Sequence, residues 1–126
     1  MSTKSGFLSS IPNIPNRLVN DIEGFDAAIS VIQQNYDNAK KSAWQNTRDE
    51  NLRQANARLK TVNDLISRVQ KAKNDLQPFL QATVSSIRSQ AQSLMNAVNS
   101  AESTINTLRT NLQSYIAAQQ AAQYSR

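Results

Sequence analysis

Apolar side chains recur at alternating intervals of three and four residues along most of this chain, and that spacing constrains the fold more than any other feature. One run begins at Leu18, a second at Leu52 and a third at Val84. A mean interval of about 3.5 residues places each run on one side of an α-helix, where it must be buried against other helices. No stretch alternates polar and apolar residues as a half-buried strand does. The pattern predicts an all-α fold of long, heptad-patterned helices of the coiled-coil type.

The members of the three runs are the residues that we expect in the core. The first run comprises Leu18, Ile22, Phe25, Ile29, Ile32, Tyr36, Ala39 and Ala43. The second comprises Leu52, Ala55, Leu59, Val62, Ile66, Val69 and, after an interruption at Lys73, Leu76. The third comprises Val84, Ile87, Ala91, Leu94, Val98, Ala101, Ile105, Leu108, Leu112 and Tyr115.

Two interruptions divide the runs into helices. The phase slips after Ala43, and Thr47-Arg-Asp-Glu50 has the order of a capping box, which predicts a tight turn near residues 45–48. A continuous helix with a stutter is the alternative there. Pro78 has no backbone N–H and suits the first turn of a helix, so we expect it to begin the third helix, with a kinked continuous helix as the alternative.

These boundaries predict one domain. Residues 16–120 form a single bundle with helices over about 17–45, 48–76 and 78–120, residues 1–15 form an extended arm, and residues 121–126 form a C-terminal tail. Folded antiparallel, the helices make a three-helix up-down-up bundle of spectrin-like proportions, a comparison of shape that rests on no spectrin motif. Because the third helix is the longest, residues 115–124 are expected to project, which makes Tyr115 and Ile116 candidates for contact with another copy.

The arm is a second candidate interface. Its apolar residues are Phe7, Leu8, Ile11 and Ile14. Pro12 and Pro15 hold the backbone extended and reduce the freedom that the arm loses on docking. The arm can lie across its own bundle or, in an assembly, across a neighbouring subunit.

The polar surface is unusual because Ser, Asn, Gln and Thr far outnumber the charged residues, which make up 18% of the chain. Between residues 79 and 120 the charged residues are Arg88, Glu102 and Arg109. Burying a charge at a contact costs several kcal/mol unless it is paired, whereas hydroxyl and amide groups can hydrogen-bond across a contact. The third helix is therefore suited to being covered by other subunits; a solvated, low-charge exterior is the alternative. Its outward positions are Ser85, Ser86, Ser89, Gln92, Ser93, Asn96, Asn99, Ser100, Ser103, Asn106, Thr107, Thr110 and Ser114.

Basic residues are concentrated in the second helix. Arg53, Lys60, Arg68 and Lys71 fall on the face opposite the apolar run. Such a stripe can follow the phosphates of nucleic acid or the headgroups of an anionic membrane. It can equally pair with the acidic first helix or remain solvated, and no aromatic residues lie between the basic ones to stack on bases.

Trp44, the single tryptophan, lies outside the first run and just before the predicted turn. We expect it to cover one end of the bundle, with an interface anchor as the alternative.

Catalysis is not expected. The chain has no histidine and no cysteine, which removes the commonest general base and the strongest nucleophile. With two glycines it lacks a phosphate-binding loop, and its carboxylates do not have the spacing of a metal site. We predict no catalytic, cofactor or metal site and no small-molecule substrate.

The sequence favours a structural, self-assembling helical subunit of an oligomer or filament. An exchangeable lipid-binding helical protein and a nucleic-acid-coating protein are the alternatives. In composition alone the chain resembles subunits of exported or viral helical filaments such as flagellin-type proteins. No apolar run has the ~20 residues of a membrane span and no signal-peptide core is present, so we expect an intracellular or virion-associated location, or export without a cleaved leader.

Overall fold

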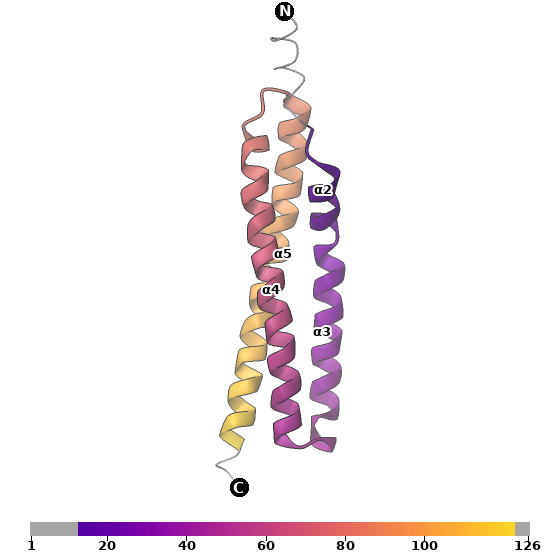
Figure 1. Cartoon of the computed structure of the whole chain (residues 1–126), viewed down its shortest axis with the longest axis vertical. Helices are drawn as coiled ribbons and strands as arrows, with labels where there is room; N and C mark the ends of the chain where they lie inside the picture. Colours follow the sequence, from indigo (N-terminus) through magenta and orange to yellow (C-terminus); the bar gives the residue numbers. More distant parts are fainter. Residues whose placement is uncertain (1–12, 123–126) are drawn as a thin grey trace, which may run out of the picture.

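The structure, a computed structural model, describes residues 13–122, and all regular secondary structure in this part of the chain is helical. The elements are α2 (Asn16–Glu23), α3 (Phe25–Ser42), the short 3₁₀ helix η1 (Ala43–Gln45), α4 (Arg48–Leu80) and α5 (Ser85–Ala122). Because α2 and α3 follow each other in one line, the described chain forms three rods lying side by side (Figure 1). The prediction of an all-α fold with three long helices is confirmed.

The three rods run alternately down and up. The chain descends along α2 and α3, reverses after η1, returns along α4 and descends again along α5 (Figure 1). The contact between α4 and α5 is the most extensive, and α2 and α3 each pack against both of these helices. One continuous apolar core therefore lies along the axis of the molecule.

This core draws on every long helix. Its largest fully buried side chains include Phe25, Leu76, Ile105, Leu108 and Leu112. The complete set of buried apolar residues in the cluster is Ile14, Leu18, Ile22, Phe25, Ile29, Ile32, Tyr36, Val62, Leu65, Val69, Ala72, Leu76, Ile87, Ala91, Met95, Val98, Ala101, Ile105, Leu108 and Leu112.

A glycine separates α2 from α3 within the helix predicted over 17–45. Gly24 has φ −83° and ψ −11°, close to helical values. Its N–H donates to the Asn20 carbonyl at 3.0 Å, and its own carbonyl accepts from the Ala28 N–H at 3.1 Å. The hydrogen-bond ladder thus continues past the glycine, and the interruption is a local irregularity in one rod.

The predicted turn near residues 45–48 is present, and the alternative of a continuous helix is wrong. The Thr47 hydroxyl accepts a hydrogen bond from the Glu50 N–H at 3.1 Å, so Thr47 is the N-cap of α4. Asn51, the one polar residue among the buried described side chains, donates to the Ala43 carbonyl at 2.9 Å. The same carbonyl accepts from the Asn46 N–H at 3.1 Å, so Asn51 adds a second bond that ties α4 to the preceding turn.

The prediction that Pro78 begins the third helix is wrong, because α4 continues through Pro78 to Leu80 and α5 begins at Ser85. Pro78 cannot donate to the Asn74 carbonyl, and α4 ends two residues later, at Leu80. Phe79 and Leu80 pack against the core, and this burial favours the extra helical residues. The loop that follows is held by Arg88, whose guanidinium donates to the carbonyls of Ala82 at 2.7 Å and Thr83 at 3.0 Å.

The packing register of α4 also differs from the expected one. Leu65 and Ala72 are buried, whereas Ile66 is half-buried and was expected in the core. Lys73, predicted to interrupt the run, lies one position beyond the buried Ala72. Between Val62 and Leu76, Val69 is buried as predicted, and the positions between are filled by Leu65 and Ala72, which were not in the predicted run.

Similar shifts occur in the other helices. In α5, Met95 is buried while Leu94 is half-buried, and Val84, which precedes α5, is 44% exposed. In the first rod the predicted large residues are buried, and only Ala39 and Ala43 are half-buried. Apolar spacing alone does not predict which of two adjacent apolar residues is buried.

The expected projection of residues 115–124 does not occur in the part that the structure describes. Because α5 begins at Ser85 instead of at 78, its end lies level with the η1 turn (Figure 1). The helix continues to Ala122, so residues 121 and 122 do not belong to a separate tail. Residues 123–126 lie outside the described residues.

Ile14 does not belong to a free arm. Its side chain is 4% exposed and lies in the chain's own core cluster, so it is not available to another copy. The cause is the position of Pro15, which directly precedes α2 and keeps Ile14 beside the bundle. The other candidate arm residues, Phe7, Leu8 and Ile11, lie outside the described residues.

Candidate interaction surfaces

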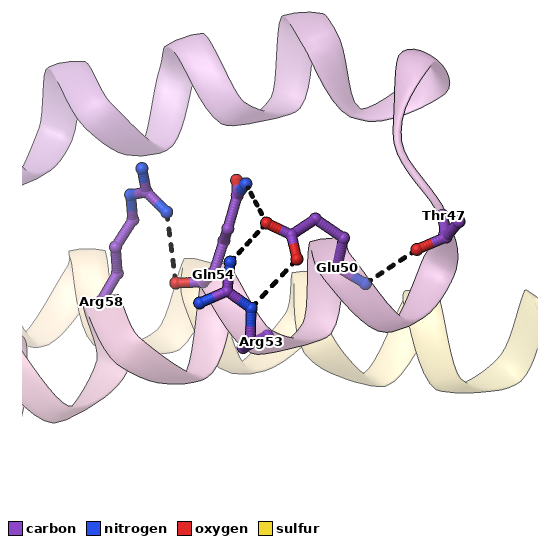
Figure 2. A network of polar contacts seen from close by, with 5 residues as sticks. All are labelled: Thr47, Glu50, Arg53, Gln54 and Arg58. Atoms are coloured by element: carbon purple, nitrogen blue, oxygen red, sulfur yellow. Dashed lines mark hydrogen bonds and ion pairs between the residues drawn. The ribbon is translucent and has the colours of Figure 1, made fainter.

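A compact polar network covers the first turns of α4 (Figure 2). The Arg53 guanidinium donates to both carboxylate oxygens of Glu50, at 3.0 Å and 2.5 Å, and Gln54 donates to the same carboxylate at 3.0 Å. These bonds, with Arg53 making the largest contribution, hold the pKa of Glu50 below its ordinary value. The Glu50 carboxylate therefore accepts hydrogen bonds from side chains of its own helix. In a complete capping box it would instead accept one from the Thr47 N–H.

The predicted basic stripe is exposed, but most of its charges have partners. Arg53 pairs with Glu50, Lys60 approaches Asp64 at 4.0 Å and Lys71 pairs with Asp75 at 2.8 Å. Each pair joins residues three or four apart on α4 itself, and not the acidic first helix.

Arg68 makes no hydrogen bond or ion pair with the residues that the structure describes, so it is the exception in the stripe. A stripe in which three of four cations have carboxylate neighbours is a weak match for a row of phosphates. The stripe therefore gives little support to the nucleic-acid and membrane alternatives.

Lys73 has a structural role between helices. Its ammonium pairs with Glu102 of α5 at 3.1 Å, and Gln70 donates to the other oxygen of the same carboxylate. The two charged side chains are 33% and 22% exposed, so water screens them only in part. This pair links α4 to α5 beside their apolar contact.

The outward face of α5 is exposed in the single chain, as its residue pattern indicates. Of the outward positions predicted from the sequence, only Asn106 is half-buried and the others are exposed. The hydroxyls of Thr107 and Thr110 each donate to the carbonyl four residues earlier, at 3.1 Å. These hydroxyl donors are therefore used within α5 itself.

Two of the three charged residues on α5 are engaged within the chain. Arg88 holds the loop before α5, and Glu102 holds α4. Arg109 is half-buried. The outward face of α5 therefore has no charged residue that is fully exposed and unengaged by these contacts.

Tyr115 and Ile116, predicted as an interface on a projecting helix end, are half-buried on the bundle itself. The Tyr115 ring meets Tyr36 of α3 edge to face, with centroids 5.8 Å apart. Burial raises the pKa of Tyr115, and the neighbouring Tyr36 adds to that rise. Tyr115 consequently contributes to the fold and has only part of its surface left for a partner.

Trp44 lies in η1 at the turn end of the bundle and is 80% exposed. The expectation that it covers the bundle end is wrong, because its side chain is exposed to solvent and does not pack on the core. Lys40 and Lys41 precede it by four and three residues, which places them on the same side of a helical segment. Lys40 also lies over the ring of Tyr36, at 4.6 Å from its centroid.

A groove of about 600 Å³ lies between α2 and α4, toward the other end of the bundle. Phe25, Leu18 and Ala72 contribute its buried apolar surface, and Phe79 is partly buried beside them. The complete lining is Pro15, Arg17, Leu18, Asp21, Phe25, Arg68, Lys71, Ala72, Asn74, Asp75, Pro78 and Phe79. Spacing within one helix cannot reveal such a groove, because it depends on how α2 sits against α4.

Within residues 13–122, no three carboxylates come close enough together to hold a metal ion. None of the helices in this range combines the length and the apolar character needed to cross a membrane.

No protein-family model matches this sequence, and no curated protein or solved structure matches it.

Proposed function

We propose that this chain is a non-enzymatic structural protein whose copies associate into an oligomer or filament. The subunit is a heptad-patterned, up-down-up bundle of spectrin-like proportions. Copies contact one another through the outward face of α5 and through the N-terminal arm.

The observation that carries the proposal is the state of the charges on α5. A soluble helix normally keeps ionised residues on its outer face, where they repel other molecules and remain hydrated. On α5, Glu102 pairs with Lys73 and Arg88 donates to backbone carbonyls, and the outward positions are otherwise Ser, Thr, Asn and Gln. Covering this face desolvates two charges without a carboxylate partner in the described residues, Arg88 and Arg109, whereas α4 carries many more charged residues, so association is less costly on α5.

The test places charges on the proposed interface. Ser93→Glu, Ser100→Glu and Thr107→Glu lie seven residues apart on the exposed side of α5. The matched control adds the same charge to exposed positions of α4 through Asn56→Glu, Asn63→Glu and Ser67→Glu. In sedimentation velocity over a concentration series, the α5 variant should remain monomeric at concentrations where the wild type and the α4 variant associate.

The arm is tested separately by deleting residues 1–12, which retains the buried Ile14. Association should weaken while the thermal midpoint of unfolding changes little. Weak specific contacts of about −5 kcal/mol form at a protein concentration of several hundred micromolar. A wild-type chain that stays monomeric at that concentration contradicts the proposal.

A further inference from the structure

Three basic residues line the groove between α2 and α4, and two of them have no partner in the described part of the chain. Lys71 pairs with Asp75 at 2.8 Å. Arg17 on α2 and Arg68 on α4 make no hydrogen bond or ion pair within residues 13–122. We infer that the groove binds a phosphorylated small molecule, whose phosphate monoester is held by the guanidinium groups of Arg17 and Arg68.

The lining of the groove has a net positive charge. Its carboxylates are Asp75, which is paired with Lys71, and Asp21, which forms no ion pair with either arginine. Three cations against two carboxylates leave a net charge of +1. Residues 1–12 and 123–126, which lie outside the described residues, contain no Asp or Glu. Their side chains therefore cannot neutralise the two arginines.

The two arginines come from different helices, and this arrangement suits a ligand that lies between them. Arg17 and Arg68 are far apart in the sequence and share one groove because α2 packs against α4. Cations that face a common space repel each other, and an anion between them removes this repulsion. A guanidinium group donates two parallel hydrogen bonds to phosphate oxygens. At neutral pH a phosphate monoester has about −1.5 to −2 charge and three acceptor oxygens, so it suits two arginines better than a singly charged carboxylate does.

The start of α2 adds to the attraction for an anion. Arg17 lies in the first turn of α2, which contains no acidic residue, and Pro15 at the N-cap accepts no side-chain hydrogen bond. The N-terminal end of a helix has a partial positive charge, so a cation there is unfavourable and an anion is favourable. A bound phosphate is therefore stabilised by this helix end as well, while the two arginines remain the main binding groups.

The rest of the lining determines the character of the ligand. The apolar residues Leu18, Phe25 and Ala72 are buried in the chain's own core, whereas Asp21 and Asn74 are exposed and can accept hydrogen bonds from hydroxyl groups. The volume of about 600 Å³ lies within the range of about 300–1,000 Å³ that is typical of small-molecule sites, so the groove has room for more than a phosphate group. The ligand is therefore hydrophilic, as a polyol phosphate or a sugar phosphate is.

The groove is separate from the surface proposed for self-association. None of its lining residues belongs to α5. Binding at the groove goes beyond the proposed structural role and requires no reaction of the ligand. Titrations made at a protein concentration at which sedimentation shows a single species keep binding and association apart.

Isothermal titration calorimetry with glycerol 3-phosphate tests the site, with glycerol and sodium chloride as reference compounds at constant ionic strength. The wild-type chain should bind glycerol 3-phosphate at a single site and should bind neither reference compound. Arg17→Gln and Arg68→Gln should each weaken binding about tenfold or more, the loss expected for a charge-assisted hydrogen bond. The double variant should show no measurable binding.

The matched control removes the same charge from positions outside the groove. Lys41→Gln with Arg109→Gln changes one residue of α3 and one of α5 and should bind glycerol 3-phosphate as the wild type does. Arg17→Lys with Arg68→Lys keeps the charge but removes the guanidinium forks, so it should bind more weakly than the wild type. Thermal unfolding without ligand establishes that each variant is folded. Added ligand should raise the thermal midpoint of the wild type and of the control but not that of the Arg→Gln double variant.

Three results would overturn the phosphate site. The first is a wild-type chain that shows no binding at about 10 mM glycerol 3-phosphate, tenfold above the dissociation constant of about 1 mM that marks weak binding. The second is an equal loss of binding in the groove variant and in the control, which would assign the attraction to the overall positive charge. The third is binding to vesicles that contain phosphatidic acid without binding of soluble glycerol 3-phosphate, which would assign the arginines to a lipid surface. None of these results alters the sedimentation test of self-association.

Discussion

Tyr36 of α3 and Tyr115 of α5 meet edge to face, with ring centroids 5.8 Å apart and ring planes at 87°. The Tyr36 hydroxyl also donates to the Asn111 carbonyl at 3.3 Å. The pair joins the first rod to the last near the turn end of the bundle. It packs the last turns of α5 against α3.

Removing this ring contact should destabilise the fold. Tyr115→Ala should lower the free energy of unfolding by about 1–2 kcal/mol, since it removes the edge-to-face contact and part of the buried surface of a half-exposed ring. Tyr115→Phe keeps the ring and should cost well under half of that. Urea denaturation of the two variants provides the comparison, and equal losses would mean that the hydroxyl, and not the ring, carries the contact.

The register of α4 can be tested with two adjacent residues. Leu65 is 3% exposed, whereas Ile66 is half-buried. Leu65→Ala should cost about 3 kcal/mol of unfolding free energy because it leaves a cavity, and Ile66→Ala should cost about 1 kcal/mol. Chemical denaturation monitored by circular dichroism measures both. A larger loss of unfolding free energy for Ile66→Ala than for Leu65→Ala would mean that Ile66 is the core residue, as the apolar run predicted.

The Lys73–Glu102 pair should contribute measurably to stability because water screens it only in part. A double-mutant cycle with Lys73→Ala and Glu102→Ala should give a coupling energy of about 1 kcal/mol. The same cycle on Lys60 and Asp64 serves as the control. Those side chains are 83% and 70% exposed and 4.0 Å apart, so their coupling should be close to zero.

Gly24 offers a stabilising substitution. A Cβ at this position would lie 3.4 Å from the Asn20 carbonyl oxygen, an ordinary contact, and φ is already helical. Gly24→Ala should therefore raise the free energy of unfolding by about 0.5–1 kcal/mol, because alanine loses less backbone freedom in a helix. Ala27→Gly on the exposed side of α3 should have the opposite effect of similar size. A loss of stability in Gly24→Ala would show that the two segments need the glycine to pack.

Acid should weaken the start of α4 through Glu50. Hydrogen bonds from Arg53 and Gln54 lower the pKa of Glu50 below its ordinary value of 4.5 in the folded state. A lowered folded pKa means that the stabilisation is complete above pH 4.5 and is lost as pH falls through the folded pKa. Below pH 4.5, the thermal midpoint of Glu50→Gln should therefore fall less with decreasing pH than that of the wild type. Added salt should reduce this difference between the two proteins, because the Glu50 carboxylate is exposed. Parallel curves for the two proteins would contradict this.

The sequence by itself determined the fold class and indicated the central turn, for which a continuous helix was the alternative. Spacing of three and four residues admits only helices, and the Thr47 hydroxyl caps α4 through a local bond to the Glu50 N–H. Such features depend on residues that are neighbours along the chain. Local geometry is therefore sufficient to predict them.

Tertiary structure decided which apolar residues face the core and which surfaces remain free. Leu65 instead of Ile66 is buried, and Lys73 turns toward Glu102, because α5 lies on that side of α4. Helix α4 passes Pro78 because Phe79 and Leu80 gain contacts with the core. Trp44 stands exposed and a groove opens between α2 and α4 only once the rods are placed against one another. These outcomes depend on contacts between residues that are distant in the sequence. The free energies of such contacts cannot be read from the residue pattern of one helix.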